Sequence, residues 1–118
     1  MIRLVILLLA VTLGPASAAG RMTFWNLTSN TVTFLSLAPA GSEAWGPNQC
    51  ANDKDGAVDA DERLPLTGVG AGRYDVRLGD RTRSCVVRNV ELSAGKPYAF
   101  SLSDADLKDC QPNAAPPK

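Results

Sequence analysis

Residues 73–90 read RYDVRLGDRTRSCVVRNV, and this stretch carries the clearest strand signal in the chain. Polar and apolar residues alternate over positions 73–78, which is the period of a strand with one face in a core. Gly79-Asp80 follows as a turn, and positions 84–90 supply a return strand. The stretch therefore predicts an antiparallel hairpin.

The flanking sequence contains further short strand patterns. Residues 22–27 and 31–37 are rich in β-branched and aromatic residues and flank the turn-like Thr28-Ser29-Asn30, so they predict another hairpin. Residues 64–67 and 98–102 predict two more strands. The frequent Gly, Pro and Asn between these patterns indicate an all-β fold of six to seven short strands. We expect an antiparallel β-sandwich, either immunoglobulin-like or a small barrel.

The two ends of the chain differ from this body. Residues 1–18 read as a cleaved secretory signal peptide, with an apolar run over positions 4–11 and the A-x-A cleavage site Ala16-Ser17-Ala18. The run is shorter than the about 20 residues that span a bilayer, so we expect a periplasmic protein without membrane insertion after cleavage. One domain over residues 19–110 would remain, followed by a disordered tail over residues 111–118. Within that domain, Ser103 as an N-cap predicts one short helix over residues 104–110.

The three cysteines, Cys50, Cys85 and Cys110, are widely spaced and lack the Cys-x-x-Cys arrangement of redox and zinc sites. Their presence is typical of an oxidising compartment. An odd number predicts one disulfide and one leftover thiol, which is either buried or paired between chains. The sequence leaves all three possible pairings open.

Composition excludes several classes of function. The chain has no histidine, so a serine or cysteine nucleophile has no imidazole base and H-E-x-x-H zinc sites are impossible. We therefore do not expect an enzyme. Removal of residues 1–18 takes one basic residue, Arg3, from twelve basic and twelve acidic ones, which leaves a net charge of −1. This balance argues against a general nucleic-acid or anionic-membrane binder.

Residues 51–62, ANDKDGAVDADE, are the most informative stretch for function. Against the EF-hand pattern D-x-[DN]-x-[DN]-G-x₅-E, carboxylates fall at ligand positions and a glycine falls at the sharp turn. The matching residues are Asp53, Asp55, Gly56, Val58 at the apolar position, Asp59 and Glu62. Alternate carboxylates at this spacing can converge on one hard cation while the glycine turns the chain around it. The stretch therefore predicts a metal-binding loop.

The match is incomplete, and a plainer interpretation exists. Ala51 stands where the first carboxylate belongs, and the flanks do not predict helices, so this is a calcium-type loop between strands and not an EF-hand. An exposed turn of Asp and Gly would look similar. However, the fit extends beyond the turn, and residues 53–62 hold five acids and one lysine, a net charge of −4. A multivalent cation relieves such repulsion, which favours metal binding.

The ligand set also indicates which ion to expect. Oxygen ligands select hard ions over zinc and copper. A trivalent ion gains roughly half again the Coulomb attraction of a divalent ion at equal distance. We therefore expect a lanthanide ion, La, Nd or similar, with calcium as the weaker alternative. Four carboxylates fall short of the six to eight oxygens such ions take, so water or a second copy in a metal-bridged dimer would complete the shell.

Three short motifs carry a resemblance to a known family. They are Trp45-Gly46-Pro47-Asn48, Asp53-Lys54-Asp55-Gly56 and Arg73-Tyr74-Asp75-Val76-Arg77. Together with the short exported chain, they resemble the landiscernin-type small periplasmic lanthanide-binding proteins of methylotrophic bacteria over most of the mature domain. The resemblance implies a metallochaperone in lanthanide trafficking, in contact with the EF-hand protein lanmodulin or another periplasmic protein. It places the metal ligands at Asp53, Asp55, Asp59 and Glu62, with Asp61 in reserve.

The remaining conspicuous residues are aromatic or basic. Strand patterns assign a core role to Phe24, Trp25, Phe34 and Phe100. Trp45 either packs in the sandwich or lies beneath the acidic loop. Five arginines concentrate on the predicted hairpin: Arg73, Arg77, Arg81, Arg83 and Arg88. They form either a solvated face interleaved with acids or a docking surface for an acidic partner, and the second option defines the alternative function, a metal-free interaction module.

Overall fold

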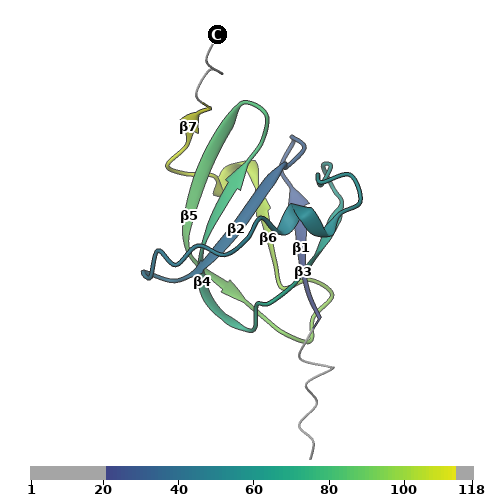
Figure 1. Cartoon of the computed structure of the whole chain (residues 1–118), viewed down its shortest axis with the longest axis vertical. Helices are drawn as coiled ribbons and strands as arrows, with labels where there is room; N and C mark the ends of the chain where they lie inside the picture. The colour runs from purple at the N-terminus through teal and green to yellow at the C-terminus, as the bar shows by residue number, and fades with distance from the viewer. Residues whose placement is uncertain (1–20, 114–118) are drawn as a thin grey trace, which may run out of the picture.

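The hairpin predicted from residues 73–90 is the centre of the larger of two sheets (Figure 1). The computed structural model describes residues 21–113. Its strands are β1 (Met22–Leu27), β2 (Phe34–Pro39), β3 (Arg63–Leu66), β4 (Gly72–Gly79), β5 (Arg83–Leu92), β6 (Phe100–Ser103) and β7 (Gln111–Pro112). The larger sheet has the order β2-β4-β5-β7 and the smaller one β3-β1-β6. The predicted all-β sandwich is confirmed, and the sheets do not close into a barrel.

All strand pairs are antiparallel except β1 and β6, which run parallel. In β3 and β1, buried and exposed side chains alternate, as expected for strands with one face in the core. Phe24 of β1 and Phe100 of β6 stack in that core with ring centroids 4.9 Å apart. Trp25 follows Phe24 directly and therefore points to the opposite face, so the prediction of a core role for Trp25 is wrong.

The predicted hairpin of residues 22–27 and 31–37 does not form, because β1 and β2 lie in different sheets. Both edges of β1 are already occupied, by β3 and by β6. The buried Asn26 side chain also shapes the connection: it donates to the carbonyls of Asn30 and Val58, each at 2.9 Å, and accepts from the Thr28 hydroxyl at 2.7 Å. These bonds turn the segment from one sheet to the other instead of back along β1.

The C-terminal region differs from its prediction in two ways. The predicted helix over residues 104–110 is only the single 3₁₀ turn η2 (Asp104–Asp106), which ends where Leu107 adopts an extended backbone. The tail predicted to be disordered from residue 111 instead begins with β7, which pairs with β5. Residues 114–118, like the predicted signal peptide of residues 1–18, lie outside the described residues. Between positions 21 and 113, no helix is long and apolar enough to cross a membrane.

The cysteines form one disulfide, Cys85–Cys110, and leave one buried free thiol, Cys50. The predicted count of one bridge and one leftover thiol is confirmed, and the structure selects the pairing that the sequence left open. Burial, assisted by the negative charge of Asp53, raises the pKa of the Cys50 thiol to about 11. Cys50 is therefore a protonated, unreactive core residue at neutral pH.

Candidate metal-binding loop

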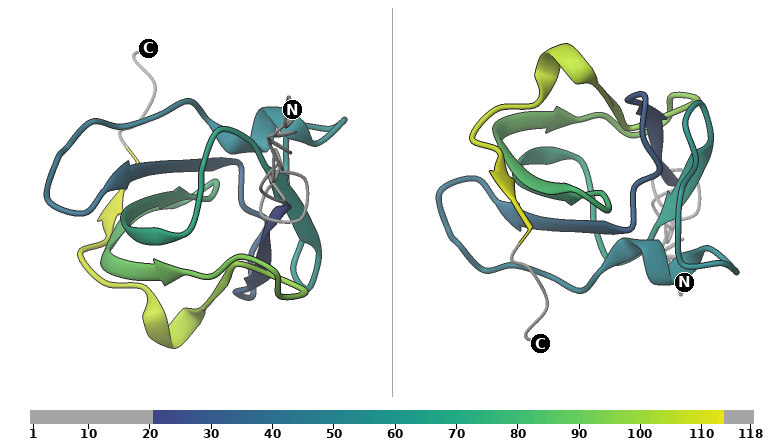
Figure 2. Two further views of the ribbon diagram at one scale, coloured as in Figure 1. Left: turned by 90° about the horizontal axis from the view of Figure 1, so that it is seen from below. Right: turned by 90° about the horizontal axis from the view of Figure 1, so that it is seen from above.

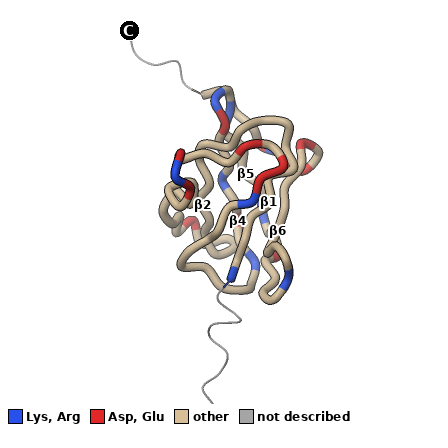
Figure 3. Tube along the Cα trace, turned by 90° about the vertical axis from the view of Figure 1, so that its right-hand side faces the viewer, with Lys and Arg blue, Asp and Glu red and all other residues tan. Residues whose placement is uncertain are grey.

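The acidic loop, residues 51–62, begins within the 3₁₀ turn η1 (Gln49–Asn52) and ends at β3, and it faces the viewer in Figure 3. Val58 anchors its middle. This side chain is 1 % exposed, and its backbone exchanges two hydrogen bonds of 2.8 Å with Val32. Because the anchor belongs to the core, it divides the loop into two arms, residues 53–57 and residues 59–62.

The first arm is a tight turn held by Asp53. Its carboxylate accepts a hydrogen bond from the Asp55 amide at 2.8 Å and a longer one from the Ala57 amide at 3.5 Å. The Gly56 amide donates to the Asp53 carbonyl, and Gly56 has a φ of 70°, the left-handed conformation predicted for the sharp turn. Asp55 is exposed, and its carboxylate accepts no hydrogen bond from residues 21–113. The Asp55 carboxylate, one of the two predicted ligands in this arm, therefore has no hydrogen-bond partner among the described residues.

The second arm runs back along β1. Asp59 is exposed and accepts one hydrogen bond, from the Thr31 hydroxyl at 2.9 Å. The indole N–H of Trp25 donates to the Asp61 carboxylate at 3.1 Å and approaches the Asp61 carbonyl at 3.2 Å. Glu62 is exposed, and its carboxylate makes no hydrogen bond to the described part of the chain. The reserve candidate Asp61 is thus held by the fold, while Glu62 remains free.

The structure does not gather these carboxylates into a preformed coordination shell. Among residues 21–113, no three His, Cys, Asp or Glu residues lie close enough together to hold a metal ion. Asp53 and Asp55 share one arm, Asp59 and Glu62 share the other, and the Val58 anchor lies between the arms. Binding of one ion by all four would need the two arms to move toward each other.

Two residues that contact the loop, Trp25 and Thr31, were not among the predicted site residues. Trp25 stands out of phase with Phe24 in the alternation of β1, and this signal could have placed it on the outer face. There its ring lies beside Tyr98, with centroids 5.2 Å apart, and under the Arg63 guanidinium at 4.8 Å. Trp45, in contrast, is half-buried and stacks on Arg77 at 4.3 Å, on the larger sheet.

The arginines of the hairpin are largely engaged within the chain. Arg73 pairs with Glu91 at 3.0 Å, Arg88 with Asp75 at 3.3 Å and Arg83 with Asp80 at 3.4 Å. Arg77 stacks on Trp45, as described above. Of the five, Arg81 makes neither an ion pair nor a ring contact with residues 21–113. This arrangement matches the interleaved face more closely than a free docking surface.

The two acids of the hairpin are structural residues. Hydrogen bonds from the amides of Gly41 and Asn89 hold the pKa of the buried Asp75 carboxyl below its ordinary value. Burial alone would raise the pKa of Asp80, but hydrogen bonds from Thr82 and Arg83 outweigh it and hold that pKa well below the ordinary range. Both carboxylates are therefore charged and saturated with donors.

The resemblance of this chain to the landiscernin-type proteins stays a prediction. No family model, curated protein or solved structure matches this chain.

Proposed function

We propose that this protein binds a hard trivalent ion, a lanthanide, through the acidic loop and acts as a periplasmic carrier or buffer in metal trafficking. The observation that carries the proposal is the unused ligand capacity of the loop. Asp55 and Glu62 accept no hydrogen bond from residues 21–113, and Asp59 accepts only one. The carboxylate oxygens of Asp55 and Glu62 are therefore available to bind a cation.

A trivalent ion would have to outweigh the contacts that the loop side chains already make. The Val58 anchor stays in place, and the side-chain bond that Asp59 gives up is the exposed one from Thr31, worth about 1 kcal/mol. A lanthanide that meets Asp53, Asp55, Asp59 and Glu62 relieves a loop charge of −4. Calcium offers two-thirds of that attraction, so we expect the same site to bind it more weakly.

Water or a second copy of the chain completes the coordination shell, because four carboxylates supply fewer oxygens than a lanthanide takes. A metal-bridged dimer is one form of this proposal. Light scattering of the mature protein with and without La³⁺ tests it: a doubling of mass supports bridging, and an unchanged mass assigns the remaining positions to water. Delivery of the ion to lanmodulin or another periplasmic protein would follow from a loop whose carboxylates are exposed.

Terbium luminescence tests the proposal. Trp25 donates a hydrogen bond to Asp61 within the loop, so it is the expected sensitiser of a bound Tb³⁺ ion, in place of Trp45. Emission should saturate at a defined stoichiometry, and Asp53→Asn with Asp55→Asn should abolish it. The matched control removes the same charge elsewhere, by Glu43→Gln with Asp109→Asn, and should leave the titration unchanged. Equal loss in both double variants would contradict the assignment of the site.

The alternative of a metal-free interaction module receives less support. Four of the five hairpin arginines are engaged within the chain, which leaves Arg81 as the free cation of that set among the described residues. A docking surface for an acidic partner would need several arginines that are free of contacts within the chain.

A further inference from the structure

Residues 104–113, which we call the strap, connect the two sheets on one side of the sandwich. The strap leaves the end of β6 in the smaller sheet and ends as β7 and Asn113 beside β5 in the larger one. Figure 2 shows it in yellow-green and yellow, running outside both sheets. It forms one wall of a groove of about 590 Å³, and β5 and β6 form the others.

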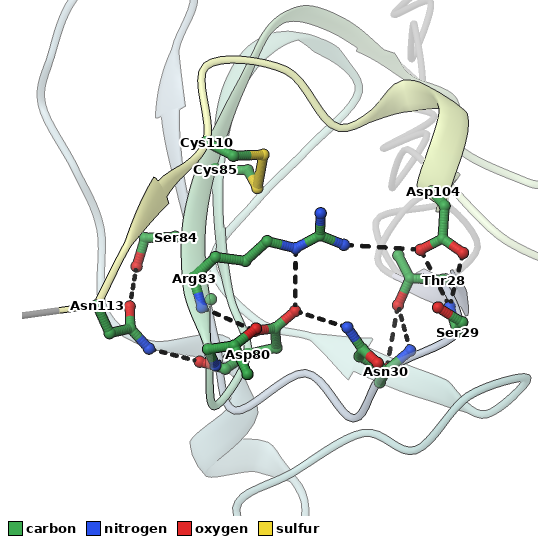
Figure 4. Close-up of polar contacts among 12 residues, drawn as sticks. Thr28, Ser29, Asn30, Asp80, Arg83, Ser84, Cys85, Asp104, Cys110 and Asn113 are labelled. Carbon is green, nitrogen blue, oxygen red and sulfur yellow. Dashed lines mark hydrogen bonds and ion pairs between the residues drawn. A yellow bond between two sulfur atoms is a disulfide. The ribbon is translucent and has the colours of Figure 1, made fainter.

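Polar contacts hold the first end of the strap. The Asp104 carboxylate accepts a hydrogen bond from the Ser29 amide, with oxygen distances of 3.1 and 3.2 Å, and lies 3.8 Å from the Arg83 guanidinium (Figure 4). The Asp104 side chain is 51 % exposed, so water competes for both contacts.

The far end of the strap is held in the same manner. The Asn113 amide donates to the Thr82 carbonyl at 3.0 Å, and its side chain donates to the Asp80 carbonyl at 2.9 Å and accepts from Ser84 at 3.1 Å. Asn113 is exposed. Each of these exposed hydrogen bonds therefore contributes little free energy to holding the strap in place.

Apolar burial contributes almost nothing to the strap. Every residue from 104 to 113 is exposed except Leu107, which is half-buried and packs against the core. Two further attachments remain: the two-residue pairing of β7 with β5, and the disulfide from Cys110 in the strap to Cys85, which is 0 % exposed in β5. The strap is thus an exposed segment with few non-covalent attachments, and its one covalent attachment is to a stable sheet.

We infer that the Cys85–Cys110 disulfide is a redox latch, and that its reduction by a dithiol releases the strap and opens the groove between β5 and β6. The reductant thiolate attacks the sulfur of Cys110, because that residue is exposed and Cys85 is buried. The mixed disulfide forms as Cys85 leaves as a thiolate and takes a proton. The second thiol of the reductant then closes its own disulfide, and the Cys110 thiol departs. Two electrons and two protons pass from the reductant to the chain.

The released strap changes the surface of the domain. β5 loses its partner β7 at Arg83 and Ser84, and the groove loses the wall formed by residues 105–109. The lining that remains consists of four apolar and two polar residues: Val86, Val87, Val90, Leu102, Arg88 and Ser101. Reduction therefore exposes a groove with a mainly apolar lining beside a free strand edge.

Hydrogen exchange of the metal-free mature protein, with and without dithiothreitol, tests this inference. The amides of Ser29 and Asn113 report the two ends of the strap, and reduction should speed their exchange about tenfold or more. The Val58 amide, bonded to Val32 in the core, should be unchanged. Alkylation followed by mass spectrometry verifies that two thiols have become reactive, while Cys50 stays buried.

The double variant Cys85→Ser with Cys110→Ser should reproduce the exchange of the reduced protein without any reductant. Unchanged exchange at Ser29 and Asn113 would overturn the inference, because the polar contacts would then hold the strap alone. A rise at Val58 equal to that at the strap would also overturn it, because the disulfide would then be a staple of the whole domain. Neither outcome involves metal, so the result is independent of the proposed function.

Discussion

The β4–β5 hairpin and the acidic loop both carry carboxylates, but the fold uses them in opposite ways. Asp75 and Asp80 are buried at 2 % and 6 % exposure, and backbone amides and arginines saturate their oxygens. Asp55 and Glu62 are exposed and accept no hydrogen bond from residues 21–113. The hairpin acids are therefore part of the architecture, whereas the loop acids retain the capacity to bind something else.

This difference indicates where function can reside in a small domain without histidine. A carboxylate that already accepts several hydrogen bonds cannot turn to a metal without leaving buried donors unpaired. An exposed carboxylate in a like-charged loop is instead relieved by a cation. Substitution of a hairpin acid and substitution of a loop acid should therefore have different effects on stability and on metal binding.

Removal of a hairpin acid should have the largest effect on stability. Asp80→Ala leaves the amides of Thr82 and Arg83 and the Asn30 side chain without their acceptor, so we expect a loss of about 3 kcal/mol in the free energy of unfolding. Asp55→Ala should change it by less than about 0.5 kcal/mol. Urea unfolding followed by fluorescence measures both. Similar losses of unfolding free energy in the two variants would contradict the difference between structural hairpin acids and free loop acids.

Lowering the pH should destabilise the folded protein by protonating the hairpin acids. Because the folded pKa of Asp80 is lowered, its stabilisation is present above the ordinary Asp pKa of about 3.9 and is lost as pH falls toward the folded value. Asp75 is shifted in the same direction. The urea midpoint should therefore be flat from about pH 7 to 5 and fall below about pH 4. Asp80→Asn should flatten that fall, and a variant as steep as the parent would contradict the assignment.

Neutralisation of loop acids should leave stability almost unchanged. Asp53→Asn keeps a side-chain oxygen that can accept from the Asp55 amide, and Asp55→Asn removes an exposed charge from a repulsive loop. We expect the double variant to unfold within about 0.5 kcal/mol of the parent. Thermal unfolding by circular dichroism measures this. A large loss would mean that the loop acids also belong to the architecture.

The smallest effect concerns the two tryptophans. Trp25→Phe removes one exposed hydrogen bond to Asp61 and should cost about 0.5 kcal/mol in unfolding free energy. The same substitution should greatly reduce sensitised terbium emission, while Trp45→Phe should reduce it little, because Trp45 stacks on Arg77. The opposite order of emission losses would place the ion away from Trp25.

Strand patterns predicted most of the fold because alternation over a few residues is a local property. The β4–β5 hairpin and strands near residues 64–67 and 98–102 could be found this way. The partners of β1 could not, because they depend on β3 and β6, which lie far away in sequence. The buried Asn26, which turns the chain between sheets, also carries no local signal of its bonds to Val58.

The candidate site shows the same limit. The spacing of residues 51–62 predicted the turn at Gly56 and the buried Val58, since both are local features of the loop. It did not predict that the Val58 anchor divides the carboxylates between two arms, because that follows from pairing with Val32.

The central claim is that the acidic loop keeps free carboxylates for a hard cation, those of Asp55 and Glu62 above all, and that the hairpin acids are not free. Titration of ¹⁵N-labelled mature protein with diamagnetic La³⁺, followed by amide NMR spectra, tests it most directly. The account predicts saturable shifts concentrated over residues 53–62, with little change at the Thr82 and Asn89 amides that bind Asp80 and Asp75. Shifts that never saturate, or that are as large at Thr82 and Asn89 as in the loop, would contradict it.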